Sequence, residues 1–431
     1  MRRASSALAS FSTAAVAVLT GCGGTSDSAP ADVPSPGGTL ELSEFEPIAI
    51  GTEPLWTWDN GTAQTMITGM SFHGDLALVD GSEQIEDGWG FSVVDAATGE
   101  IQWSMHALDL LEDDVSAMPD SGLAVSERHE VIAMPYYSPH CVTEPCPPQR
   151  RQSPERGVAG LDLRTGAVQW RSPVVASADE AAGPGQSDPD RALRIIGGTD
   201  EVLTVVTGPS APLLQESAGD PADFRTLALR PADGTEAWSA EGARAVTTTG
   251  TIAVAFTGTS AARRSLTALE LDGGEERWSG EGPSGTVVGI SDDRLLLQDD
   301  TEHQLIDLTD GTSAHRLSDA LGTPVLDTET GMLVYRTEGD RDRLRTLMPG
   351  ELDGPLLSGA EVPLRAEPQL SAGGRILTYD RSEGTTAIVD RSGAELGERL
   401  LGFPVALTGD HLVLRRGAGE DAVFSVHART S

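Results

Sequence analysis

The feature that most constrains the fold is a phrase that recurs along the chain: an apolar pair, an acidic residue, a turn ending in glycine, and a tryptophan. Two clear copies occupy residues 93–103 and 161–170. Each copy predicts two short strands joined by a tight turn, because Asp or Thr followed by Gly supplies the positive φ that a hairpin needs. The tryptophan then falls at a fixed offset from the glycine. Copies with fixed offsets indicate repeated supersecondary units.

The spacing of the copies gives the size of the repeated unit. Further copies end at Trp238 and Trp278, and later ones around Gly311, Gly354 and Gly393 lack the tryptophan. The turn glycines at 273, 311, 354 and 393 are separated by 38, 43 and 39 residues. Each copy also follows an apolar run bounded by Gly and Asp, which is a strand signal. A four-stranded unit of about 40 residues is the period of a β-propeller blade.

The two ends of the chain complement each other. Residues 423–431 contain the third strand and the turn of a last copy, and residues 53–61 contain a tryptophan-bearing strand with no copy of its own. We therefore predict an all-β propeller of four-stranded blades whose ring is closed by an N-terminal strand that completes the C-terminal blade. Such closure leaves no free sheet edge. The count favours eight blades, with seven as the alternative if the copy near Gly354 is not a blade.

Three insertions lengthen the early repeats of this propeller, which should span residues 46–431. They cover residues 137–155, 176–192 and 209–223, and they are rich in Pro, Gly, Asp and Ser. This composition is typical of loops. In a propeller such loops collect on one face or on the rim, where binding usually occurs.

The N-terminus has the features of a targeting segment. Arg2 and Arg3 precede an apolar and small-residue run over residues 7–18 that is too short for a membrane span. The run ends in Leu-Thr-Gly-Cys at residues 19–22, which resembles the lipobox of bacterial lipoproteins. We predict a signal peptide over residues 1–21, lipidation of Cys22, and a flexible tether over residues 22–45. The protein should then be anchored to the outer leaflet of the cell membrane; an unmodified secretory signal is the alternative.

The other two cysteines are Cys141 and Cys146. An exported protein lies where disulfides persist, and four intervening residues can close a small loop, so we expect a disulfide. A metal site would need two more soft ligands, of which His140 is one candidate. A redox-active pair is more often separated by two residues.

The charge of the chain excludes one class of partner. Sixty-six acidic residues oppose 30 basic ones, for a formal net charge of −36, and every basic residue is Arg. A phosphate backbone would be repelled, so we expect no nucleic acid, and adsorption to anionic lipid is disfavoured. A solvated acidic surface, a cation-rich habitat or a basic partner accounts for this balance.

The phrase Leu-Asp-x-x-Thr-Gly-x-x-x-Trp resembles the quinoprotein-type repeat, and residues 50–431 are similar to the PQQ-like β-propeller family. The resemblance implies that each tryptophan packs between neighbouring blades. In the closing strand this role goes to one of Trp56 and Trp58, and Trp58 is our assignment. The positions expected to dock blades are Trp58, Trp103, Trp170, Trp238 and Trp278.

The resemblance also bears on activity. Quinoprotein dehydrogenases hold their quinone with a ring formed by adjacent cysteines, and no adjacent cysteines occur here. The family includes lipid-anchored, non-catalytic members that act as scaffolds at the cell envelope, and this chain is similar to those. We therefore assign no catalytic residue, cofactor or metal, since the acidic run at residues 109–114 has no calcium-loop glycine turn. The expected function is protein binding, scaffolding or sensing with an envelope protein partner. The alternative is a quinone- or metal-dependent oxidoreductase or a carbohydrate-active enzyme that uses the central channel.

Overall fold

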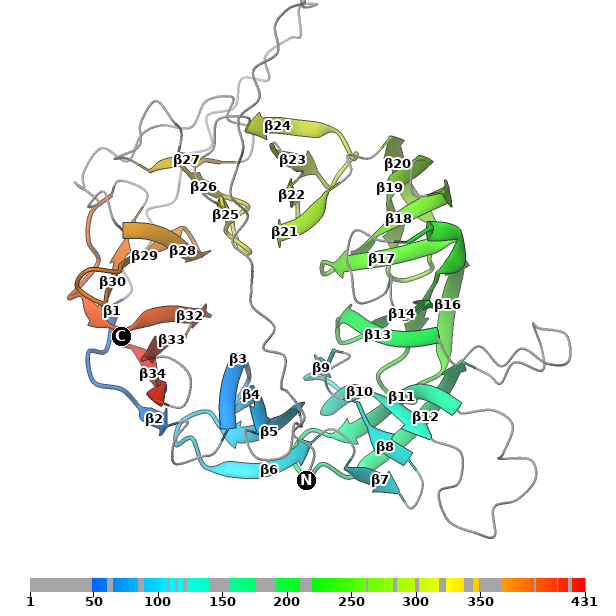
Figure 1. Cartoon of the computed structure of the whole chain (residues 1–431), viewed down its shortest axis with the longest axis horizontal. Coiled ribbons are helices and arrows are strands. Elements are labelled where there is room, and N and C mark those ends of the chain that lie inside the picture. Colours follow the sequence, from blue (N-terminus) through cyan, green and yellow to red (C-terminus); the bar gives the residue numbers. More distant parts are fainter. Residues whose placement is uncertain are drawn as a thin grey trace, which may run out of the picture. The chain divides into compact units, whose positions relative to one another are not determined.

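Eight antiparallel sheets follow one another around a ring in the computed structural model, and the strands nearest the centre are β3, β9, β13, β17, β21, β25, β28 and β32 (Figure 1). Within a sheet the strands are hydrogen-bonded largely in the order in which they occur in the sequence. This arrangement is a β-propeller, and each sheet is one blade. The predicted all-β fold with eight blades is confirmed, and the alternative of seven blades is wrong.

The structure describes residues 49–430 with internal gaps. The gaps are residues 60–64, 84–88, 107–108, 113–114, 119–121, 139–154, 176–190, 210–218, 261–262, 282–284, 299–301, 318–322, 337–343, 349–365, 391–392, 409 and 418–420. The chain divides into two units, Met1–Phe45 and Glu46–Ser431, and every described residue belongs to the second.

Blades 1 to 4 occupy the first half of the ring. Blade 1 contains β3 (Thr65–His73), β4 (Leu76–Glu83), β5 (Trp89–Asp95) and β6 (Ile101–His106). Blade 2 contains β7 (Leu110–Glu112), β8 (Val115–Ala117), β9 (Ala124–Ser126), β10 (Val131–Ser138), β11 (Glu155–Asp162) and β12 (Val168–Val175), and both β8 and β9 pair with β10. Blade 3 contains β13 (Arg191–Gly198), β14 (Leu203–Pro209), β15 (Arg225–Leu229) and β16 (Glu236–Glu241). Blade 4 contains β17 (Ala243–Thr248), β18 (Ile252–Ser260), β19 (Arg263–Glu270) and β20 (Glu276–Glu281).

Blades 5 to 8 complete the ring. Blade 5 contains β21 (Thr286–Ile290), β22 (Arg294–Gln298), β23 (His303–Asp307) and β24 (Ser313–Leu317). The described strands of blade 6 are β25 (Val325–Leu326), β26 (Leu333–Tyr335) and β27 (Arg345–Leu347). Blade 7 contains β28 (Ala366–Ala372), β29 (Arg375–Asp380), β30 (Thr385–Val389) and β31 (Leu400–Leu401). Blade 8 contains β32 (Phe403–Leu407), β33 (His411–Arg416), β34 (Val423–Thr430) and, from the other end of the chain, β1 (Ala49–Ile50) and β2 (Trp56–Asp59).

The ring closes as the sequence predicts. Strand β2 pairs antiparallel with β34, with Trp56 opposite Val426, and β1 pairs with the end of β34, with Ala49 opposite Thr430. The N-terminal strands therefore form the outer edge of the C-terminal blade. This closure joins residues that are more than 350 positions apart in the sequence.

The hydrophobic core lies between blades rather than within them. Among the described residues it consists of eight buried clusters, and each cluster joins two neighbouring blades. Alternate residues of one strand enter different clusters: Leu76 and Leu78 face blade 2, whereas Ala77 and Val79 face blade 8. Side chains of a strand point alternately to its two faces, so every sheet packs on both sides.

The innermost strands share a bulge at an equivalent position. In six blades one residue of the first strand is skipped in its pairing with the second, as at Thr68 between Ile67 and Gly69. The other skipped residues are Ile196, Val246, Val288, Gln369 and Val405. A bulge bends a strand and increases its local twist, which suits the crowded centre of the ring.

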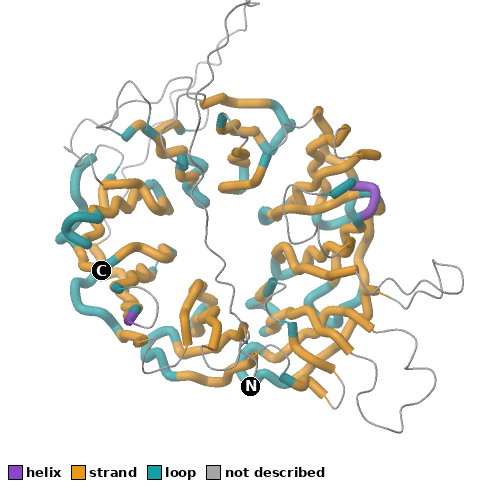
Figure 2. Tube along the Cα trace, in the orientation of Figure 1, coloured by secondary structure: helices purple, strands orange, loops and turns teal. Residues whose placement is uncertain are grey.

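The described part of the chain is almost entirely strand and turn (Figure 2). A short 3-10 turn, η2 (Pro221–Asp223), follows Asp220, whose side chain accepts a hydrogen bond from the Ala222 N–H. Among the described residues, no helix has the length and apolar character that crossing a membrane would require.

Candidate functional site

Within the described part of the chain, tryptophans hold neighbouring blades together at five of the eight junctions. At each of them an indole Nε1–H donates a hydrogen bond to a backbone carbonyl in the third-to-fourth-strand turn of the next blade. The pairs are Trp56 with Ala96 O at 2.9 Å, Trp103 with Leu163 O at 2.9 Å, Trp170 with Pro231 O at 2.7 Å, Trp238 with Leu271 O at 2.6 Å, and Trp278 with Leu308 O at 2.7 Å. The five junctions run consecutively from blades 8 and 1 to blades 4 and 5.

The glycine that ends each of these turns lies against the incoming indole. These glycines have φ between 71° and 78°. A Cβ on Gly166 would lie 2.8 Å from the Trp103 ring, and one on Gly274 would lie 2.7 Å from the Trp238 ring. Positive φ and the close approach of the indole therefore both require glycine. In the fourth copy the residue that meets this requirement is Gly274 and not the expected Gly273.

The expected docking role of Trp58 is wrong, because Trp56 holds that position. In blade 1, Trp103 is paired with Val93, and in blade 8 the equivalent partner Val426 is paired with Trp56. Trp58 lies two residues further along, opposite Phe424, and packs against the cluster between blades 8 and 1. The register of the closing strand decides between the two tryptophans, and two side chains on the same face look alike in the sequence.

Polar groups join the blades where a docking tryptophan is not described. The buried Arg294 of blade 5 donates to Gly331 O (3.3 Å) and Met348 O (3.2 Å) of blade 6. Thr386 of blade 7 donates from Oγ1 to Gly402 O, in the connection to blade 8, at 2.6 Å; Thr226 of blade 3 makes the same kind of bond to Ala243 O, so this contact also occurs at a junction with a tryptophan. In blade 5 the docking register is occupied by His315, which pairs with Leu305. None of these side chains belongs to the repeated phrase, so no sequence pattern indicated them.

Asp327 makes the densest set of these polar contacts. It is fully buried. Its Oδ2 accepts hydrogen bonds from Ser371 Oγ (2.8 Å) and Gly374 N (2.9 Å) of blade 7, and its Oδ1 accepts from Glu329 N and Thr330 N of its own turn. One carboxylate therefore satisfies four donors and links blade 6 to blade 7.

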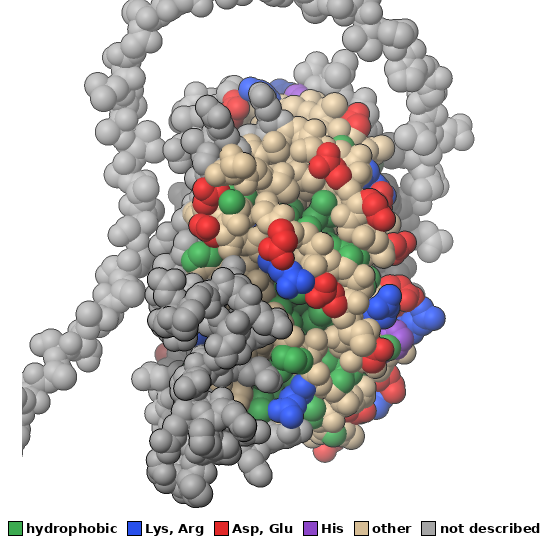
Figure 3. Space-filling view, turned by 90° about the vertical axis from the view of Figure 1, so that its right-hand side faces the viewer, with side chains coloured by type: hydrophobic (Ala, Val, Ile, Leu, Met, Phe, Trp, Pro, Cys, Tyr) green, Lys and Arg blue, Asp and Glu red, His purple; other side chains and the backbone are tan. Residues whose placement is uncertain are grey.

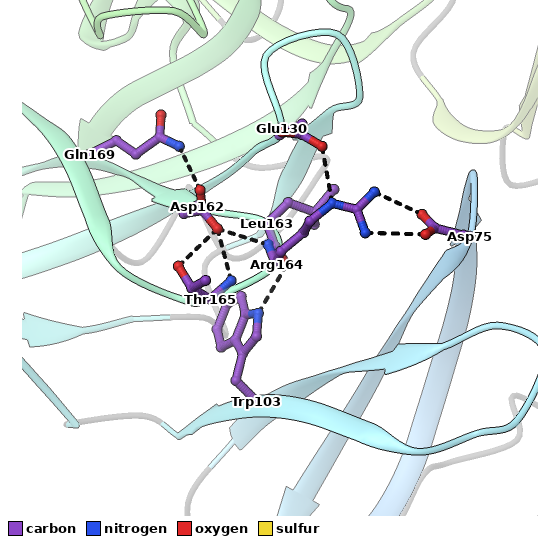
Figure 4. A network of polar contacts seen from close by, with 8 residues as sticks. All are labelled: Asp75, Trp103, Glu130, Asp162, Leu163, Arg164, Thr165 and Gln169. Carbon is purple, nitrogen blue, oxygen red and sulfur yellow. Dashed lines mark hydrogen bonds and ion pairs between the residues drawn. The ribbon is translucent and has the colours of Figure 1, made fainter.

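An exposed ion network clamps blade 1 to blade 2 (Figure 4). The Arg164 guanidinium pairs with both oxygens of Asp75, at 3.1 and 3.0 Å, and its Nε lies 3.0 Å from Glu130 Oε1. The hydrogen bond from Arg164 is the main cause that lowers the pKa of Asp75. These side chains are half or more exposed, so water and salt screen the network. The network therefore orients the two blades more than it stabilises them.

The acidic residues of the turns are used as internal caps. Asp95 accepts hydrogen bonds on Oδ1 from Thr98 N (2.8 Å), Thr98 Oγ1 (2.9 Å) and Ala97 N (3.0 Å). The bond from the Thr98 hydroxyl is the largest cause that lowers the pKa of Asp95. Asp162 caps the corresponding turn of blade 2 in the same way. Side-chain oxygens that close turns in this manner stabilise the ionised form and are unsuited to donating protons.

The rim over blades 3 and 4 carries acidic side chains with arginines among them (Figure 3). Arg225 pairs with Glu236 (3.2 Å) and Glu241 (3.0 Å), and Arg277 pairs with Glu270 (2.6 Å). Arginine on this rim is therefore used to bridge carboxylates of the same blade.

The two ends of the ring differ in the length of their connections. First-to-second and third-to-fourth strand turns lie at one end, and they are short where described, as between β3 and β4 or between β19 and β20. Second-to-third connections and blade-to-blade connections lie at the opposite end, because successive strands are antiparallel. The chain leaves the described part at Ser138 and returns at Glu155 at this second end. The three predicted insertions all join strands there; residues 139–154, 176–190 and 210–218 of them lie outside the described residues.

The predicted lipidation, disulfide and acidic-run residues lie wholly or partly outside the described residues. Cys22, Cys141 and Cys146 lie outside the described residues, so lipidation and the disulfide stay predictions. In the acidic run, Asp109 accepts a hydrogen bond from His106 N at 2.7 Å, and Asp113 and Asp114 are outside the described part. Within the described ranges, no three His, Cys, Asp or Glu side chains gather as a metal site would need.

One partly buried carboxyl responds to pH within the ordinary range. Burial raises the pKa of Asp80, on β4, to about 6. The protonated Asp80 carboxyl costs the folded state nothing below pH 3.8, its ordinary pKa. As pH rises through about 6 the folded state must hold a desolvated charge, and the protein loses stability.

We expect Asp80→Asn to be more stable than the natural protein by about 1 to 3 kcal/mol at pH 7.5, because the amide carries no charge to bury. This difference should shrink as pH falls from 6 toward 4. Denaturant unfolding at several pH values measures it. A difference between the two proteins that does not change with pH would contradict the assignment.

Comparison with known proteins identifies structures with a similar chain trace. BamB from Moraxella catarrhalis is 14% identical over 88% of this chain and 100% of that chain, with a TM-score of 0.46. The C-terminal WD40 domain of Sif2 is 9% identical over 88% and 98%, with a TM-score of 0.46. KlHsv2 with loop 6CD replaced by a Gly-Ser linker is 10% identical over 85% and 98%, with a TM-score of 0.40.

These likenesses are too distant to transfer a function, and the propeller assignment rests on the sheet topology itself. No family model matches the sequence, and no curated protein matches it. Membership of the PQQ-like family therefore stays a prediction.

Proposed function

We propose that the chain is a non-catalytic, lipid-anchored β-propeller that binds a protein partner on the extracytoplasmic side of a bacterial membrane. In this proposal Cys22 carries the lipid, residues 22–45 form the tether, and the eight-bladed body carries the binding surface. The lipid on Cys22 would attach the protein to the membrane, and the loops of the propeller would bind the partner.

The observation that supports the binding role is the difference between the two ends of the ring. The turns at one end are short, and many are closed by their own carboxylates, as Asp95 and Asp162 show. The three long insertions of blades 2 and 3 join strands at the other end, next to β10, β12 and β14. Rigid blades that present loops on one side are a common arrangement for recognition. We therefore place the partner at this end, over blades 2 and 3.

The charge of the chain supports attachment by a lipid rather than by adsorption. With a net charge of −36 the body is repelled by anionic head groups. A covalent lipid with a tether would hold such a body near the membrane without laying it on the surface. A partner with a basic surface would gain from the same charge during encounter.

The test of the anchor is cell fractionation. The full chain should be found with the membrane, and Cys22→Ser should release it, while Cys141→Ser should leave it membrane-bound. Equal fractionation of the natural chain and Cys22→Ser would overturn the proposal of a lipid anchor on Cys22.

The test of the binding role is cross-linking in intact cells followed by mass spectrometry. Two variants replace residues 139–154 or 210–218 with a short Gly-Ser link, and a control variant, Asp310→Asn, alters a turn at the opposite end. A partner that is captured by the natural chain and the control but lost from a folded loop variant supports the proposal. Capture that is unaffected by either loop, or a stoichiometric quinone or calcium ion in the purified protein, would overturn it.

A further inference from the structure

The segment that closes the ring touches β34 through few groups. Between β1 and β2 the chain leaves the sheet over residues 51–55. Its backbone bonds there are Gly51 N to Ala428 O (2.9 Å) and Leu55 N to Val426 O (2.7 Å). Thr52, Glu53, Pro54 and Leu55 are exposed. The residue of β34 that lies between these two bonds is His427.

The His427 side chain fills this break in the strand pairing. It is only 4% exposed. Its Nδ1 lies 2.9 Å from Gly51 O, and its Nε2 lies 3.1 Å from Ser425 Oγ. A carbonyl can only accept, so Nδ1 carries the proton, and the neutral ring then accepts from the Ser425 hydroxyl through Nε2. The neutral ring thereby connects the closing segment to β34.

The surroundings of His427 disfavour a second proton on the ring. Burial is the largest cause that lowers the pKa of His427; the hydrogen bond with Gly51 raises it, the charge of Arg416 on β33 lowers it, and Glu53 of the closing segment raises it. Of the other groups on β33, His411 stacks on Phe72 of blade 1 and Arg415 lies over Phe403.

Blade 7 packs against the same face of β34. Phe424 and Val426 face blade 1, so Ser425 and His427 face blade 7 by alternation. Blade 7 and the closing segment contribute apolar residues to the cluster at this junction, including Leu377, Leu400 and Ile50. The charged groups of blade 7 near β31 engage one another, with Arg399 paired to Glu383 and Glu395.

We propose that His427 is a pH-dependent clasp on the ring-closing segment, whose protonation releases residues 49–55 from β34 while Trp56 keeps the ring closed. A protonated ring must donate from Nε2, so the Ser425 hydroxyl has to turn round, and a positive charge is buried beside Arg416. Release of the segment lets the imidazolium reach water. Trp56 is held separately, by its bond to Ala96 O and its burial against blade 1.

The clasp controls two features of the body. Opening frees seven residues at its N-terminal end, which adds up to about 24 Å of extended chain. It also uncovers the backbone edge of β34 near Ala428. The inference concerns the folded body alone and does not depend on the proposed anchor or partner.

Hydrogen exchange read by mass spectrometry on the full chain tests the clasp. After correction for intrinsic rates, protection of residues 49–55 should fall between pH 7.5 and 5.0, because the released segment lets the ring take up a proton. The peptide that spans β16 and β17 contains no histidine and should keep its protection. An unchanged ratio between the two peptides would overturn the proposal.

Three variants separate the clasp from general acid loosening. His427→Asn keeps a donor near the place of Nδ1 but cannot titrate, so the pH dependence at residues 49–55 should disappear. Arg416→Gln should lessen the acid loss of protection, and Glu53→Gln should enlarge it; both positions are exposed, so these variants should fold. NMR titration of the ring should show the pKa rising in Arg416→Gln and falling in Glu53→Gln. Shifts in the same direction, no shift, or pH dependence that persists in a folded His427→Asn would overturn the proposal.

Discussion

Replacing Trp238 with alanine is expected to lower the free energy of unfolding by about 3 to 5 kcal/mol, the range for truncating a buried aromatic side chain. The indole is 8% exposed, packs in the cluster between blades 3 and 4, and donates to Leu271 O at 2.6 Å. Truncation removes both the packing and the hydrogen bond at one junction. Denaturant unfolding followed by tryptophan fluorescence and circular dichroism measures the loss.

Two further variants show whether the tryptophan acts on the glycine of the next blade. Trp238→Phe keeps an aromatic ring and loses the N–H, so it should cost less than the alanine variant. Gly274→Ala should be destabilising because its φ is +78° and because a Cβ would lie 2.7 Å from the indole. In the double variant, Trp238→Ala with Gly274→Ala, the new Cβ no longer meets an indole. The glycine substitution should then cost only its backbone strain, about 1 to 2 kcal/mol. Additive effects of the two substitutions would show that the residues do not dock together.

Asp327→Ala is expected to lower the free energy of unfolding by about 3 to 5 kcal/mol. The carboxylate is fully buried and accepts from four donors, and each buried donor left without a partner costs about 1 to 3 kcal/mol. Exchange of the Gly374 amide should also quicken, because its acceptor belongs to the neighbouring blade. Thermal and denaturant unfolding, together with hydrogen exchange of residues 371–375, measure the two effects.

The matched control is Asp310→Ala in blade 5. Asp310 also caps a turn, with bonds from Thr312 N and Thr312 Oγ1, but it is exposed and both bonds stay within its own turn. Its unfolding midpoint should stay close to that of the natural protein. If both aspartates cost the same, the buried link between blades 6 and 7 is not what makes Asp327 important.

The architecture could be predicted because its signals are local. A tight turn needs a glycine within a few residues of the strands that it joins, and a strand with two buried faces needs a near-continuous apolar run. The turn at Gly166 and the apolar run in β10 can both be recognised from the local sequence, without knowledge of any other blade. The missing fourth strand at the C-terminus could be matched to residues 53–61 for the same reason, since each half is a recognisable part of one copy.

The partner groups at the junctions could not be predicted, because they come from different copies. Trp170 meets a turn 61 residues later, at Pro231, and no local pattern states which turn that is. The choice between Trp56 and Trp58 depends on strand register. Arg294 links blades 5 and 6 through carbonyls of the next blade that no local pattern identifies. The bulges of the inner strands likewise depend on how eight sheets converge on one centre.

The sequence by itself determined the all-β class, the length of the repeated blade and the strand that closes the ring, since turn chemistry and the two-residue alternation of strands act over a few residues; it left eight or seven blades open. Only the tertiary structure decided which tryptophan closes the ring, which carboxylate holds blades 6 and 7, and that His427 sits buried against Gly51. Those outcomes depend on which surfaces of separate blades meet, and burial and hydrogen-bond partners exist only once the blades are packed.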